Sequence, residues 1–175
     1  DPDTLHKQYQ VLLRELAYRA SHPVPNSGRT PLKPLRLYWM GEETLEFQLY
    51  NFIEDCGGTI VGSDTRLSSY YKPIKEDGSP LENLADWIWH MPCNLPTVER
   101  MKVTLPQIRS QKPDAIIINS LIGSRNLPGA ERLVKDIIKG ELDLPMLSIE
   151  TGLFGHNLEE VKVQLKTFIE TNMRP

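Results

Sequence analysis

Residues 113–121 read Pro-Asp-Ala-Ile-Ile-Ile-Asn-Ser-Leu, a short apolar run with a proline before it and polar residues near its end. The run at 115–119 shows no alternation between apolar and polar positions, which is typical of a strand buried on both faces in a parallel sheet. Similar short runs lie at 35–40 (LRLYWM), 58–62 (GTIVG) and 145–149 (PMLSI). The sequence therefore predicts four strands.

Amphipathic segments lie between and after these runs. Apolar residues at three- and four-residue spacing predict helices over 43–55, 81–90, 97–111, 129–139 and 158–171. We expect Pro106 to kink or split its helix, Gly140 to end the fourth helix, and Asn157 with Glu160 to cap the fifth. Right-handed crossovers give the strand order 2-1-3-4. The predicted fold class is α/β, a Rossmann-like (flavodoxin-like) doubly wound parallel sheet of about four strands with an N-terminal helix.

The N-terminal part differs in character from the rest. Residues 4–20 predict a helix capped by Asp3, with an apolar face at Leu5, Tyr9, Leu12, Leu13, Leu16 and Ala20. Four prolines follow within 22–34, and proline removes amide donors and fixes φ, so this stretch reads as a linker. We predict an N-terminal helix and linker over 1–34 and an α/β domain over 35–175.

Composition excludes several classes of protein. The chain has 175 residues, of which 39% are hydrophobic and 25% charged, as in a soluble globular protein. Its net charge of −3 and its lack of a long apolar run argue against nucleic-acid and membrane partners. Two cysteines and no signal-peptide pattern predict a cytoplasmic protein. Because the chain starts at Asp1 rather than Met, we expect a processed or excised piece.

Common cofactor motifs are absent from the sequence. No G-x-G-x-x-G follows the first predicted strand, and no G-x-x-x-x-G-K-[ST] occurs, so neither a dinucleotide site nor a P-loop is expected. Cys56 and Cys93 have no second cysteine at ligand spacing, and we interpret them as buried thiols. The four histidines share no helical face, so we expect no metal site; His156 is interpreted as a local hydrogen-bonding residue.

A ligand in such a sheet is expected beyond the carboxyl ends of the strands, near the switch point between the first and third strands. This rule selects Gly41–Thr44, Ser63–Tyr71, Ser120–Asn126 and Glu150–Gly155. For both the loop with Arg66 and the loop with Ser120, Ser124 and Arg125, an ordinary polar loop remains the alternative to an anion-binding one. The stretch from Trp87 to Met91 is interpreted as core, with partner contact as the alternative.

Seven segments in order resemble one known family: LLRELAYRA, PLRLYWMGEE, FIEDCGGTIVGSD, WIWHMPCNLPTVER, QKPDAIIINS, LPMLSIETG and VQLKTFIETN. The chain from about 9 to 172 resembles the carboxy-terminal domain of the 2-hydroxyacyl-CoA dehydratase and benzoyl-CoA reductase subunit family, which includes the 2-hydroxyglutaryl-CoA dehydratase D-component. The resemblance implies an acyl-CoA substrate, a homologous or larger partner subunit, and a [4Fe–4S] cluster in the family that carries the difficult chemistry.

The sequence departs from that family where the cluster is concerned. The family's cysteine after the third strand is replaced here by Ser120, and Cys93 matches a Pro-Cys turn that is not a cluster ligand in the family. The family's Ile-Glu-x-Asp strand end reads Ile149-Glu150-Thr151-Gly152, so its acid is lost. We therefore expect no cofactor in this chain.

Two functional hypotheses remain. The first is a domain or subunit of a dehydratase- or reductase-like assembly, a lyase or reductase component that is inactive as an isolated chain. The second is a non-catalytic scaffold or interaction module that keeps the fold without the redox role. In the first hypothesis the arginines hold anionic groups, the glycines allow close backbone approach, and the ligand-binding residues are Gly41, Glu42, Arg66, Ser120, Gly123, Ser124, Arg125 and Glu150.

Overall fold

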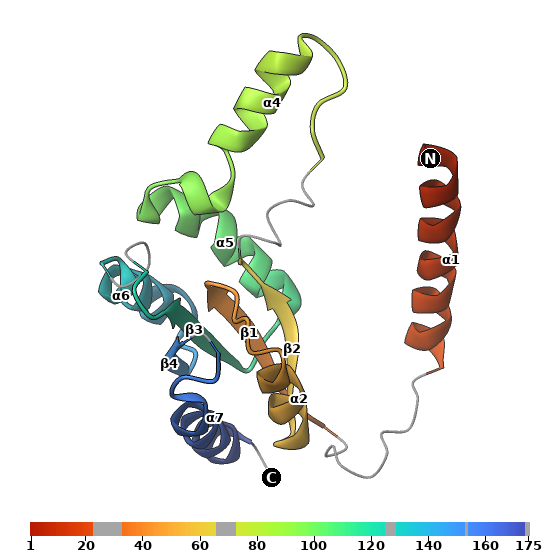
Figure 1. The fold of residues 1–175 in the computed structure, drawn as a ribbon. Helices are drawn as coiled ribbons and strands as arrows, with labels where there is room; N and C mark the ends of the chain where they lie inside the picture. The colour runs from red at the N-terminus through yellow and green to blue at the C-terminus, as the bar shows by residue number, and fades with distance from the viewer. Residues whose placement is uncertain (23–32, 66–72, 125–128, 153, 174–175) are drawn as a thin grey trace.

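The computed structural model describes residues 1–22, 33–65, 73–124, 129–152 and 154–173. At its centre is a four-stranded parallel sheet in the order β2-β1-β3-β4 (Figure 1). Its strands are β1 (Leu35–Gly41), β2 (Gly58–Ser63), β3 (Ala115–Leu121) and β4 (Met146–Thr151). The predicted fold class and strand order are confirmed, and each predicted strand lies within two residues of the observed one.

Helices cover both faces of this sheet. Helices α2 (Gln48–Asp55) and α7 (Leu158–Asn172) pack on one face, and α5 (Thr97–Gln111) and α6 (Glu131–Leu142) pack on the other. The chain also forms α1 (Pro2–Ser21), α4 (Pro80–Trp89) and a single 3-10 turn, η1 (Pro92–Asn94). The result is the doubly wound arrangement that alternating strands and helices predict.

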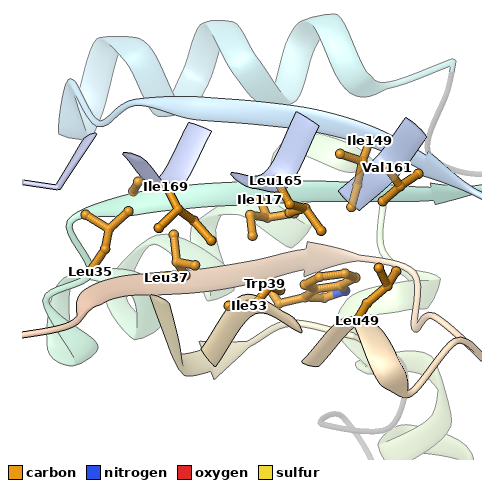
Figure 2. Close-up of a cluster of buried hydrophobic side chains, with 11 residues drawn as sticks. Leu35, Leu37, Trp39, Leu49, Ile53, Ile117, Ile149, Val161, Leu165 and Ile169 are labelled. Atoms are coloured by element: carbon orange, nitrogen blue, oxygen red, sulfur yellow. The ribbon is translucent and has the colours of Figure 1, made fainter. Parts of the chain in front are cut away.

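Two hydrophobic cores follow from this layering, because successive side chains of a strand point to opposite faces. Ile117 of β3 joins Leu37 and Trp39 of β1 beneath α2 and α7, as Figure 2 shows. Ile116 and Ile118 point the other way, into the core beneath α5 and α6. The unbroken apolar run of β3 is therefore needed because both of its faces are covered.

Two helix boundaries differ from the prediction. Helix α2 begins at Gln48 rather than at residue 43, because the Thr44 hydroxyl accepts a hydrogen bond from the Glu46 amide at 3.1 Å, a local alternative to helical pairing. Helix α6 continues past Gly140 to Leu142, and Asp143 supplies the left-handed C-cap with φ of 48°. Glycine was therefore the wrong signal for the end of α6.

Proline and the caps also behave differently from the expectation. Helix α5 runs unbroken through Pro106, which lies on the solvent-exposed side, where water can satisfy the carbonyl that proline leaves unpaired. The N-cap of α1 is Asp1, whose carboxylate accepts from the Asp3 amide, so Asp3 is not the cap. Asn157 precedes α7 as predicted, but its side chain makes no cap hydrogen bond.

Helices α1 and α4 contain no buried residue, and most of their apolar side chains are exposed. The expected core role of the Trp87–Met91 stretch is thus wrong in part: Met91 is buried, whereas Trp89 is 74% exposed. Leu5, Tyr9, Leu12, Leu13 and Leu16 of α1 are each more than half exposed. Within the described part of the chain, no helix combines the length and apolar character that crossing a bilayer requires.

Candidate functional site at the carboxyl edge of the sheet

Glu42 closes the switch point between β1 and β3. It follows Gly41, whose φ of 100° requires glycine at the end of β1. One carboxylate oxygen of Glu42 accepts from the Leu121 amide at 2.7 Å, and the other accepts from the Ser124 hydroxyl at 2.5 Å. Since both oxygens are engaged, Glu42 ties the loop after β1 to the loop after β3.

The backbone of Glu42 is held by the same two strands. Its amide donates to the Asn119 carbonyl at 2.9 Å, and its carbonyl accepts from Trp39 Nε1 at 2.9 Å and from Asn119 Nδ2 at 2.8 Å. Buried Asn119 then accepts from the Thr151 hydroxyl at 3.0 Å, which links β3 to β4. A continuous polar network therefore runs along the carboxyl edge from β1 to β4.

A buried ion pair supports the other side of this edge. Asp64, directly after β2, is 4% exposed, and its carboxylate accepts from Arg100 of α5 at 3.0 Å. The Gly41 amide donates to Asp64 at 2.9 Å and the Thr104 hydroxyl donates at 3.2 Å. All of these partners are donors, so the charge of Asp64 is compensated and the position of Gly41 is fixed.

Tyr38 lies beside this pair. Burial and, secondarily, the Asp64 carboxylate raise the pKa of the Tyr38 phenol well above its ordinary value. Its hydroxyl makes only a long contact, 3.5 Å, to Gln107 Oε1. Tyr38 is therefore a neutral core residue that keeps a polar atom next to the ion pair.

The loop after β3 turns at Gly123, whose φ is 85°. A Cβ added at this glycine would meet nothing within 4 Å, and the Ser124 amide donates to the Leu121 carbonyl at 2.9 Å. The structure thus explains Gly123 by the turn that it makes. Arg66 and Arg125, the two residues predicted to hold anionic groups, lie outside the described residues.

A hollow with a volume of about 550 Å³ lies along the outer edge of β4. Ser120 of β3, Ser148 and Glu150 of β4, Glu131 of α6 and His156 before α7 contribute to its wall. Ser120 is 5% exposed, and neither its hydroxyl nor that of Ser148 has a partner at hydrogen-bond distance among the described residues. His156 makes no hydrogen bond with those residues either, so its predicted local role finds no support.

The two cysteines belong to different parts of the chain, and neither follows β3. Cys56 caps the end of α2 and lies just before β2 begins, which places it at the amino end of the sheet and away from Ser120. It is half-buried, and burial raises the pKa of its thiol. Cys93 belongs to η1, before α5. An iron–sulfur cluster needs several thiolates around one point, and the described residues do not provide that donor set.

A family model described as 2-hydroxyglutaryl-CoA dehydratase, D-component, matches residues 1–172. The chain belongs to this family. No curated protein matches the chain. Membership in the D-component family identifies a dehydratase-like component and confirms the family that the seven segments indicated.

Of the eight predicted ligand residues, the network brings together Gly41, Glu42 and Ser124, and the hollow brings together Ser120 and Glu150. Asp64, Arg100 and Asn119 were missed by the sequence analysis. Their signal was nevertheless present, since a charged or amide residue directly follows or ends an apolar strand at Asp64 and Asn119. Nothing in the sequence pairs Asp64 with Arg100, because 36 residues separate them.

Proposed function

We propose that this chain is a domain or subunit of a 2-hydroxyacyl-CoA dehydratase- or benzoyl-CoA reductase-like assembly. The family match over residues 1–172 carries the proposal, and the polar network at the carboxyl edge supports it. Ligands of doubly wound sheets bind at this edge, at the switch point where Glu42 lies. The proposed role is to hold and shield part of a bound acyl-CoA for chemistry completed together with a partner.

The proposed ligand face consists of Gly41, Glu42, Ser120, Gly123, Ser124 and Glu150, with Arg66 and Arg125 added for the anionic groups of the ligand. The CoA phosphates suit the arginine loops, because guanidinium groups bind phosphate oxygens in a bidentate manner.

The proposal includes no iron–sulfur cluster bound by this chain alone. A cluster would supply single-electron transfer in such an assembly, but the two cysteines lie on different elements and neither follows β3. The isolated chain is therefore proposed to be inactive, as a lyase or reductase component that lacks its redox partner. The low cysteine count fits a cytoplasmic location.

A protein partner is proposed to cover the exposed apolar side chains. Helix α1 contributes Leu12 and Leu16, and α4 contributes Leu81 and Trp89, each more than half exposed. Soluble proteins rarely leave such helical faces in water, and exposed aromatic residues are typical anchors of interfaces. We propose a homologous or larger subunit as the partner.

One observation favours a second candidate, a scaffold that has lost the ligand. Both carboxylate oxygens of Glu42 are engaged by groups that could otherwise bind a ligand, the Leu121 amide and the Ser124 hydroxyl. A bound anion would have to displace Glu42. In the scaffold candidate this closure is permanent and the fold serves only to dock a partner.

Titration with 2-hydroxyacyl-CoA thioesters distinguishes the two candidates. ¹H–¹⁵N NMR spectra of the chain are recorded with increasing thioester and, as a control, with free CoA. A ligand-holding component shows saturable shifts at Gly41, Gly123 and Ser124 that are stronger with the thioester. The absence of any shift at millimolar thioester, together with a stable hetero-assembly in sedimentation, would favour the scaffold.

A further inference from the structure

The hollow beside β4 lies beyond the switch point at Glu42 and shares Ser120 and Glu150 with the proposed ligand face. It lies at the outer edge of the sheet, between the start of α6 and the start of α7, and its volume of about 550 Å³ falls within the range of small-molecule sites. Ile122, which is 45% exposed, provides the main accessible apolar surface of its lining. Both its size and its mixed lining suit a small organic ligand with an aliphatic part.

The charge of this hollow is one-sided. Three carboxylates line it, from Glu131, Glu150 and Glu160, and the described residues of the lining include no lysine or arginine. Glu131 is paired with Lys135 at 2.5 Å, and Glu160 accepts from Gln164 at 3.3 Å. The carboxylate of Glu150 has no hydrogen-bond or ion-pair partner among the described residues. An anion placed here would be repelled, whereas a cation would gain a carboxylate partner.

Two buried hydroxyls provide the second, independent observation. The side chains of Ser120 and Ser148 point to the same face of the sheet, because Ser120 lies opposite Glu150 in the register and Ser148 lies two residues before Glu150. Buried hydroxyls without a partner are costly and rare in folded proteins. A ligand with several hydrogen-bond donors, placed beside Glu150, would satisfy both oxygens.

Glu131 keeps its charge in this environment. Although partial burial opposes ionisation, the Lys135 ammonium holds the pKa of Glu131 below its ordinary value. Its position in the first turn of α6 also favours the carboxylate. Near neutral pH Glu131 therefore contributes a carboxylate to the wall of the hollow.

We propose that this hollow binds the primary ammonium or guanidinium group of a small organic amine. The cationic group sits between Glu150 and the hydroxyls of Ser120 and Ser148, and its aliphatic chain lies on Ile122, which is 45% exposed. An ammonium carries three donors and no acceptor, which matches a wall of acceptor oxygens. A bare metal ion fits less well, since no cluster of three metal-ligating side chains occurs in the described part of the chain.

The test uses the full chain and four probes that share a four-carbon chain: agmatine, butylamine, neutral 1-butanol and anionic butyrate. Amide shifts in ¹H–¹⁵N NMR spectra report binding, with no acyl-CoA present, so that failure of this proposal is distinguishable from failure of the acyl-CoA proposal. We expect saturable shifts at Ser120, Ser148 and Glu150 with both amines. Butyrate and butanol are expected to bind at least about tenfold more weakly.

Two variants and two matched controls locate the binding site. Glu150→Gln and Ser120→Ala are expected to weaken agmatine binding about tenfold, which corresponds to loss of a hydrogen bond to a charged group. Glu54→Gln on α2 and Ser110→Ala on α5, both exposed and outside the hollow, should leave binding unchanged. Ser120→Ala should not lower thermal stability without ligand, because its hydroxyl makes no hydrogen bond.

Three results would overturn the proposal. One is the absence of shifts with either amine at millimolar concentration. Another is binding of butyrate as strong as that of butylamine, which would refute the argument from charge. The third is an equal loss of agmatine binding in the control variants, which would show that the amine binds acidic surface residues in general.

Discussion

Replacement of Asp64 by asparagine is expected to be the most costly single change at the carboxyl edge. Asp64 is 4% exposed, and its carboxylate accepts from Arg100, from the Gly41 amide and from the Thr104 hydroxyl. Asparagine keeps the shape but removes the charge and points donors at Arg100. Removing one partner of a buried ion pair costs about 3–5 kcal/mol.

The expected value is at the low end of that range, because the Arg100 side chain is 16% exposed and retains some contact with water. We therefore expect Asp64→Asn to lower the free energy of unfolding by about 3 kcal/mol. In a chain of this size, that corresponds to a decrease in Tm of roughly 6–12 °C. Urea unfolding followed by circular dichroism provides the free energy, and a thermal scan provides Tm.

Asp86→Asn is the matched control. Asp86 also faces two nitrogen donors, the Lys75 ammonium at 3.5 Å and the His90 imidazole at 3.0 Å, but its side chain is 49% exposed. An exposed pair of this kind contributes about 0–1 kcal/mol. If Asp64→Asn costs no more than Asp86→Asn, the Asp64–Arg100 pair does not hold the edge, and the reasoning is refuted.

Three further predictions concern single side chains. Glu42→Gln should lower the free energy of unfolding by about 1–2 kcal/mol, because the charge-assisted hydrogen bonds from Leu121 and Ser124 weaken. It should also speed hydrogen exchange at the Leu121 amide, and an unchanged exchange rate would contradict this prediction. Because burial raises the pKa of Tyr38, the unfolded state releases the phenolic proton at a lower pH than the folded state does. The free energy of unfolding should therefore fall as pH rises above about 10, the ordinary pKa of tyrosine. Tyr38→Phe should reduce this fall, and identical pH profiles of the variant and the parent chain would contradict the prediction. Trp89→Ala should change the stability of the isolated chain by less than about 0.5 kcal/mol, since Trp89 is 74% exposed, and a larger loss would mean that Trp89 packs within the chain.

Strands and topology were predictable because their signals are local. The Ala115–Ile118 run fixes a strand buried on both faces, and crossover handedness then limits the strand order. Helix ends were less predictable, since they depend on single contacts such as the Thr44 hydroxyl or the left-handed Asp143. The expected burial of Trp89 failed because an apolar helix face does not specify whether its cover belongs to the same chain.

The candidate site was predictable only as a region. The carboxyl-edge rule selected the segments that contain Glu42, Ser120 and Glu150. It did not reveal that Glu42 is already bound by Leu121 and Ser124, because that contact joins residues about 80 positions apart. Likewise, the unpartnered hydroxyls of Ser120 and Ser148 follow from the register of β3 and β4, which no local pattern specifies.

The central claim is that this member of the dehydratase family contributes to an assembly without holding its own cluster. The most direct test is anaerobic reconstitution of the chain with iron and sulfide. Bound iron is then measured, together with the visible absorbance that sulfur-to-iron charge transfer in a cluster would produce. The account predicts little bound iron, equal in the chain and in a Cys56→Ser/Cys93→Ser variant. A full cluster's complement of iron per chain, lost in that variant, would contradict it.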